Sequence, residues 1–221
     1  MTNFEILRQR MVDNQIRVSD VTDHRVIRAF AQTPRELFVP SAQKPFAYGD
    51  RDIPIAGGET GERFLLAPMV LAKMIQALQI ESTNVVLDIG CGSGYCAAIL
   101  AQLAGSVVAV EEEGALVSAA EANLQSLGFD NVAILQGKTI DGLASEGPFD
   151  AILISGGVEE VPEALNEQLN DCGRLVAVVM SGRMGQARLY ERAGSHISEC
   201  ALFDAYAPIL PGFTKTRGFV F

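Results

Sequence analysis

From residue 84 onward the chain alternates short apolar runs with amphipathic stretches. Runs of Val, Ile and Leu that are bounded by glycine or polar residues are typical of strands buried in a parallel sheet. The predicted strands are 85–88, 107–111, 132–135, 149–154 and 174–180, and the predicted helices between them are 94–103, 114–127 and 162–169. Such regular alternation predicts right-handed crossovers and an α/β fold with a doubly wound, mostly parallel sheet.

The end of the chain breaks this alternation. Residues 187–192 and 197–203 are both strand-like, and the three residues from Ala193 to Ser195 between them have the length of a hairpin turn. We therefore expect a seven-stranded sheet that finishes in an antiparallel hairpin. We expect the tail GFTKTRGFV, which carries Phe213, Lys215, Arg217 and Phe219, to be ordered and packed on the domain.

The first 80 residues precede this sheet and are predicted to be largely helical. Asp23 is placed to cap a helix that ends before Pro34, and Pro68 suits the first turn of another. Between them, 52–55 is predicted as a short edge strand and 55–64 as a glycine-rich loop.

The chain is accordingly divided into two regions that form one compact unit. Residues 1–80 are predicted to be a largely helical region, and residues 81–221 an α/β core.

The segment around which the core is organised runs from Asn84 to Tyr95, with the sequence NVVLDIGCGSGY. A buried strand ends at Asp88 and is followed by glycines at 90, 92 and 94. Glycine adopts positive φ readily and lets a ligand approach the backbone without meeting a Cβ atom. The segment therefore predicts a nucleotide-sized pocket at the carboxyl end of a strand.

The spacing of the glycines indicates which nucleotide. The dinucleotide pattern G-x-G-x-x-G would need a third glycine at Tyr95, which disfavours a nicotinamide oxidoreductase. The pattern here is D-x-G-x-G-x-G, and Glu111 closes the next strand 21 residues after Gly90. This arrangement resembles the first motif, and the acid that follows it, of S-adenosylmethionine-dependent methyltransferases.

Composition and charge argue against several classes of binding partner. The formal charge of −10 and the isoelectric point of about 4.7 argue against nucleic acid, whose phosphates require a basic face. No apolar run approaches the roughly 18 residues that a membrane span needs. The N-terminus lacks the apolar core of a signal peptide, so a cytoplasmic location is expected. The four cysteines and two histidines show no metal-ligand spacing, and we expect no metal site.

Several stretches together are similar to the protein-L-isoaspartate O-methyltransferase family. They are MVDNQIR at 11–17, TPRELFVP at 33–40, AYGDRDIPI at 47–55, VVLDIGCGSGYCAAILA at 85–101, PFDAILISGG at 148–157, VPEALNEQL at 161–169 and GRLVAVV at 173–179. The resemblance runs from about Met11 to Pro211. It implies that residues 1–80 form a helical lid and substrate region, and that residues 81–221 form the core that binds the cofactor. It implies a Rossmann-like class I methyltransferase fold, S-adenosyl-L-methionine as cofactor and a protein or peptide substrate whose isoaspartyl carboxylate accepts the methyl group.

The resemblance also implies roles for individual residues. The cofactor's amino-acid end is expected on the backbone of Gly90, Cys91, Gly92 and Ser93. Asp88 is expected to orient this turn, Glu111 to hold the ribose, Gly137 and Lys138 to line the adenine side, and Ser155 to lie near the sulfonium. Thr60 and Glu62 are the candidates for the acceptor site.

Two departures from the family pattern fall at this predicted site. Glu62 stands where the family has a serine, and its charge would repel a substrate carboxylate unless Arg63 or another cation compensates. Lys138 stands where the family has a cofactor-binding acid, and lysine cannot accept a hydrogen bond.

These departures leave two alternatives open. One is a methyltransferase with a different acceptor, and the other is a cofactor-binding protein that has lost turnover. The sequence does not indicate an oligomeric state.

Overall fold

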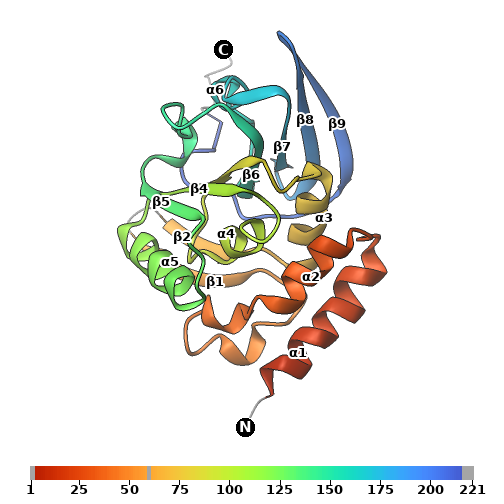
Figure 1. Ribbon diagram of the computed structural model, residues 1–221, viewed down its shortest axis with the longest axis vertical. Helices are drawn as coiled ribbons and strands as arrows, with labels where there is room; N and C mark the ends of the chain where they lie inside the picture. Colours follow the sequence, from red (N-terminus) through yellow and green to blue (C-terminus); the bar gives the residue numbers. More distant parts are fainter. Residues whose placement is uncertain (1–2, 59–60, 216–221) are drawn as a thin grey trace.

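The computed structural model describes residues 3–58 and 61–215. Its centre is a seven-stranded sheet with the strand order β5-β4-β3-β6-β7-β8-β9 (Figure 1). The strands are β3 (Val85–Ile89), β4 (Ser106–Glu111), β5 (Val132–Gln136), β6 (Phe149–Val158), β7 (Leu169–Ser181), β8 (Met184–Ala193) and β9 (His196–Asp204). Strands β3 to β7 pair in parallel, whereas β8 is antiparallel to both β7 and β9. The predicted fold class is confirmed.

The order of the strands reverses at the middle of the sheet. The chain runs outward from β3 through β4 to β5, then crosses back to place β6 on the other side of β3. Ligands of open α/β sheets bind outside the carboxyl ends of the strands at such a reversal. This reversal places the ends of β3, β4 and β6 next to one another, which is where the sequence predicts a cofactor.

The helices begin and end largely where the sequence predicts. They are α1 (Phe4–Met11), α2 (His24–Gln32), α3 (Pro68–Leu78), α4 (Tyr95–Leu100), α5 (Gly114–Ser126) and α6 (Glu163–Asn166). Asp23 caps α2 by accepting a hydrogen bond from the backbone N–H of Arg25 at 2.7 Å. Pro68 occupies the first turn of α3. The helices α4 and α6 are shorter than predicted.

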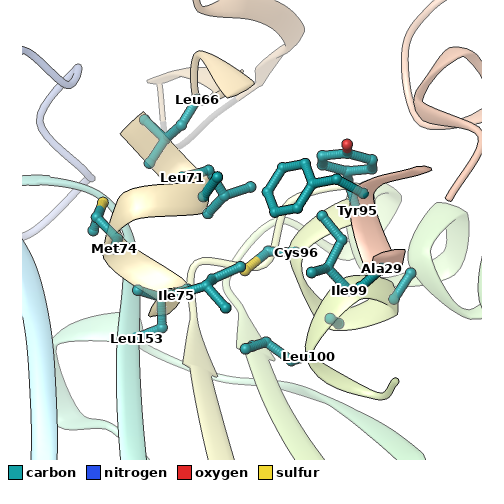
Figure 2. Close-up of a cluster of buried hydrophobic side chains, with 14 of the residues drawn as sticks. Ala29, Leu66, Leu71, Met74, Ile75, Tyr95, Cys96, Ile99, Leu100 and Leu153 are labelled. Atoms are coloured by element: carbon teal, nitrogen blue, oxygen red, sulfur yellow. The ribbon is translucent and has the colours of Figure 1, made fainter. Parts of the chain in front are cut away.

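Two apolar clusters cover the two faces of the sheet. On one face, side chains of β3, β6 and β7 pack against α2, α3 and α4. Figure 2 shows the centre of this cluster, where Leu71 and Ile75 of α3 lie between α4 and Leu153 of β6. On the other face, Leu87 and Ile154 pack with α6 and with the segment that follows β9. Burial on both faces explains the continuous apolar runs of the central strands.

The prediction of a loop over 55–64 is wrong. Strand β1 (Ile53–Gly58) pairs antiparallel with β2 (Gly61–Leu65) and forms a separate two-stranded sheet. The predicted edge strand at 52–55 is thus the beginning of a hairpin. Glycines are usually depleted in strands, so their presence in this segment predicts a loop where the structure has a hairpin.

The chain after β9 returns to the end of β6. The N–H of Gly157 donates to the carbonyl of Pro208 at 2.8 Å, and the N–H of Leu210 donates to the carbonyl of Gly157 at 2.9 Å. Phe213 is buried, so the described part of the tail packs on the domain as predicted. Arg217 and Phe219 lie outside the described residues. Among the described residues, no helix is both long and apolar enough to cross a membrane.

Candidate active site

The turn after β3 has the backbone conformation that only glycine adopts readily. The φ angles are +75° at Gly90, +57° at Gly92 and +93° at Gly94. The N–H of Gly90 donates to the carbonyl of Val110 at 2.8 Å, which ties the turn to the end of β4. The hydroxyl of Ser93 donates to the carbonyl of Phe38 at 2.6 Å. The turn is thus fixed on one side by the sheet and on the other by the N-terminal region.

Asp88 and Ser155 meet across the ends of β3 and β6. Ser155 lies in an irregularity of β6, between the residues that pair with Val176 and Val178 of β7. Bulges of this kind re-aim side chains at the edges of sheets. The Ser155 hydroxyl donates to Oδ1 of Asp88 at 2.5 Å. Burial raises the pKa of Asp88 to about 7, although the hydrogen bond from Ser155 acts in the opposite direction.

Glu111 is completely buried at the end of β4. Its carboxylate accepts backbone N–H hydrogen bonds from Gly92 at 2.8 Å, Glu112 at 2.9 Å and Glu113 at 3.1 Å. Charge-assisted hydrogen bonds of this kind hold a carboxylate in one orientation. Glu111 therefore faces the glycine turn, as the sequence predicts for a ribose-binding acid.

The main partner of Glu111 is Arg63 of β2, which the sequence does not predict. Nη1 of Arg63 lies 2.5 Å from Oε1 of Glu111, and the two side chains are 2% and 0% exposed. Nη2 of Arg63 also donates to the carbonyl of Gly90 at 3.1 Å. From the sequence, Arg63 is expected only as a cation that could compensate for Glu62. Successive side chains of a strand point to opposite faces, so Arg63 turns inward while Glu62 is exposed.

Two apolar side chains fill the remaining space over the glycines. A Cβ atom built on Gly92 would lie 2.6 Å from Cδ1 of Ile55, and one built on Gly90 would lie 2.9 Å from Cδ1 of Leu210. At Gly156, in the irregular part of β6, it would lie 2.5 Å from Cγ of Leu210. The surface of the glycine turn where a ligand would lie is thus covered by three side chains of this protein, those of Arg63, Ile55 and Leu210.

The two thiols near this turn are too buried to act as nucleophiles. Cys91 and Cys96 are buried, and burial raises the pKa of each thiol well above its usual range. A thiolate role for Cys91 is therefore disfavoured, and contact of its backbone with the cofactor stays a prediction. Among the described residues, no group of three or more His, Cys, Asp or Glu side chains could hold a metal ion.

Three further predicted residues are Gly137, Lys138 and Thr60. The N–H of Gly137 donates to the carbonyl of Glu111 at 3.0 Å, which joins it to the site through the backbone. The side chain of Lys138 is exposed. Thr60 lies outside the described residues.

Glu62 lines a separate cavity of about 710 Å³ together with Asp52, Phe64, Met180, Gly182, Tyr206, Ala207, Pro208 and Ile209. Two of these side chains, Asp52 and Glu62, are carboxylic acids. Burial raises the pKa of Asp52, whose Oδ1 accepts a hydrogen bond from the N–H of Ala67 at 2.8 Å. The predicted acceptor residue and the predicted cofactor residues therefore face different spaces, on the two sides of β2.

The sheet, its closing hairpin and the glycine turn define a class I methyltransferase fold. The model of the family described as "Protein-L-isoaspartate(D-aspartate) O-methyltransferase (PCMT)" matches residues 7–208. The protein-L-isoaspartate O-methyltransferase of Roseiflexus castenholzii is 41% identical over 211 residues, which cover 95% of this chain and 94% of the relative. The enzyme of the same name from Koribacter versatilis is 35% identical over 220 residues, covering 98% and 97%. The chain belongs to the protein-L-isoaspartate O-methyltransferase family.

Solved structures agree on the fold. A structure named protein-L-isoaspartate O-methyltransferase matches with a TM-score of 0.82 and 24% identity, covering 93% of this chain and 66% of that one. A Plasmodium falciparum β-aspartate methyltransferase in complex with S-adenosyl-L-homocysteine matches with a TM-score of 0.77 and 21% identity, covering 95% and 99%.

The residues at the sheet reversal suit S-adenosylmethionine in kind but not in their present arrangement. The glycine turn offers bare backbone, and Glu111 offers an acceptor for hydroxyl groups. Arg63, Ile55 and Leu210 nevertheless occupy the surface of that turn. The cofactor therefore fits this site only after these side chains move.

Proposed function

We propose that the protein is an S-adenosylmethionine-dependent methyltransferase that esterifies the isoaspartyl carboxylate of damaged proteins or peptides. The observation that carries this proposal is the family match over residues 7–208. It is supported by the convergence of Asp88, the glycine turn, Glu111 and Ser155 at the reversal of the sheet.

We assign the cofactor's contacts as follows. The backbone of residues 90–93 binds its amino-acid end, and Glu111 binds the ribose hydroxyls. Asp88 orients the turn, with Ser155 beside it near the sulfonium. Gly137 and Lys138 line the adenine side. When bound, S-adenosylmethionine supplies a methyl group on a positively charged sulfur.

The chain's own part is alignment and the exclusion of water. A substrate carboxylate is already ionised at pH 7, so no general base is required. We propose that residues 1–80 form the lid and substrate region, and residues 81–221 the cofactor-binding core. The bond from Ser93 to Phe38 supports a close coupling of the two, since it joins the glycine turn to the TPRELFVP segment. Holding reactants in line while excluding water is what such a lid contributes.

We also propose a cytoplasmic location, with proteins as substrates and no nucleic-acid partner. The charge of −10 supports this proposal, because phosphate backbones require a basic surface.

The test is methyl transfer from radiolabelled S-adenosylmethionine to a peptide that contains one isoaspartyl residue. The matched control is the same peptide with ordinary aspartate. We expect base-labile methyl ester in the isoaspartyl peptide alone. A folded protein that binds the cofactor and forms no ester would refute the proposal.

A second acceptor class is favoured by Glu62 and Asp52. Both acids line the 710 Å³ cavity beside β2, and their charges suit a neutral or cationic acceptor better than a carboxylate. Methylation of a basic peptide under the same conditions, with no ester on the isoaspartyl peptide, would favour this alternative.

A further inference from the structure

We propose that Arg63 is a built-in competitor of the cofactor, and that its ion pair with Glu111 closes the site until S-adenosylmethionine displaces it. The proposal rests on the proposed function, because it concerns the cofactor site assigned there. It identifies β2 as the element that controls access to that site.

The first support is electrostatic. The guanidinium of Arg63 binds Oε1 of Glu111 at 2.5 Å and the carbonyl of Gly90 at 3.1 Å. The same carboxylate is the assigned acceptor for the cofactor's ribose. Arg63 N–H groups and ribose hydroxyls are both hydrogen-bond donors, so they compete for one acceptor.

The second support is steric. Side-chain carbons of Leu210 lie 2.9 Å and 2.5 Å from where a Cβ atom of Gly90 or Gly156 would be, and Cδ1 of Ile55 lies 2.6 Å from where one of Gly92 would be. Bare glycines are useful where a ligand approaches the backbone closely. Here side chains from β1 and from the segment after β9 take that place.

The third support is that the closed arrangement can be undone locally. Strands β1 and β2 pair only with each other in the described sheets and lend no strand to the seven-stranded sheet. Ile53, Ile55 and Leu65 anchor this hairpin in the apolar core, so the movement that opens the site is a local one, of Arg63 and the residues beside it. When Arg63 leaves, Glu111 keeps its three backbone N–H partners, so its charge remains hydrogen-bonded. Nε of Arg63, which has no hydrogen bond within the described residues, gains water on leaving.

The apparent affinity for the cofactor is then reduced by the fraction of molecules that are open. Substitutions that weaken the closed state should tighten binding without adding a contact. This sign is the opposite of the one expected for a residue that holds the cofactor.

The experiment is calorimetric titration of the full chain with S-adenosyl-L-homocysteine. The variants are Arg63→Met, which removes the charge at similar length, and Leu210→Ala, which removes the apolar plug. The control is Arg51→Met, because Arg51 is exposed and stacks on Phe46 at 4.8 Å. We expect Arg63→Met to bind at least about tenfold more tightly than the wild type. Leu210→Ala should also bind more tightly, and Arg51→Met should be unchanged.

Hydrogen exchange of the wild type provides a test that needs no substitution. We expect saturating S-adenosyl-L-homocysteine to speed exchange in 61–65 and to slow it in 89–93. The proposal is overturned if folded Arg63→Met binds no more tightly than the wild type, or if 61–65 becomes more protected with ligand.

Failure of this proposal is distinguishable from failure of the proposed function. Ester formation by the wild type, with unchanged affinity in Arg63→Met, would sink the competitor role alone. Tighter binding in Arg63→Met, with no ester from any variant, would sink the isoaspartyl activity alone.

Discussion

The ion pair between Arg63 and Glu111 makes a strong prediction about stability. The charged atoms lie 2.5 Å apart, and the side chains are 2% and 0% exposed. Removing one partner of such a pair leaves an uncompensated buried charge and costs about 3–5 kcal/mol. We expect Glu111→Gln to reach this range, because Arg63 then keeps only the carbonyl of Gly90. We expect Arg63→Met to cost less, about 1–3 kcal/mol, because three backbone N–H groups still bind Glu111.

The assay is urea unfolding of the wild type, both single variants and the double variant. In the double variant neither charge is left alone, so its loss should be smaller than the sum of the single losses by about 2 kcal/mol or more. Two single losses below about 1 kcal/mol that add within about 0.5 kcal/mol would refute the reasoning, because that is how an exposed pair behaves.

Three further predictions follow from single residues. Burial raises the pKa of Asp88 from 3.8 to about 7, so the folded state binds more protons than the unfolded state between these values. Stability should therefore fall as the pH rises from about 4 to about 7, by at most about 4 kcal/mol, and melting curves of Asp88→Asn should lack this dependence. Gly157→Ala should lose about 1–3 kcal/mol in thermal unfolding, because its Cβ would lie 2.4 Å from the backbone oxygen of Ala207; an unchanged melting temperature would contradict this packing. Glu62→Ser should raise kcat/KM for an isoaspartyl peptide roughly threefold to tenfold by removing a repulsive charge, whereas exposed Glu81→Ser should not, and equal values for both would show that Glu62 does not face the substrate.

Much of the fold could be predicted because its signals are local. Five apolar runs predict the parallel strands, and they are confirmed within a few residues except for β7, which begins earlier. The cap at Asp23 and the proline at 68 predict the starts of α2 and α3 correctly. The hairpin of β1 and β2 could not be predicted in the same way. Its pairing is local, but its glycines and the irregularity between Pro54 and Ala56 interrupt the alternation that would indicate strands.

The candidate site also contains residues that the sequence predicts and residues that it does not. Asp88, the glycine turn, Glu111 and Ser155 belong to the ends of strands, and the parallel order of the sheet brings them together as expected. The sequence does not predict Arg63 there, because its inward direction follows from strand β2, and the glycine-rich segment 55–64 is typical of a loop. Exposure alternates between Glu62 and Arg63 in the structure, but two consecutive charged residues give no such signal in the sequence. Leu210 was missed because it lies 54 residues or more from the glycines that it covers, at 90 and 156.

A crystal structure of the protein with S-adenosyl-L-homocysteine tests the central claim most directly. We expect the ribose to lie within hydrogen-bonding distance of Glu111, with Arg63 withdrawn from that carboxylate and Leu210 displaced from Gly90. A saturated complex in which the Arg63–Glu111 pair remains intact and the ligand lies elsewhere would contradict both the cofactor assignment and the role of β2.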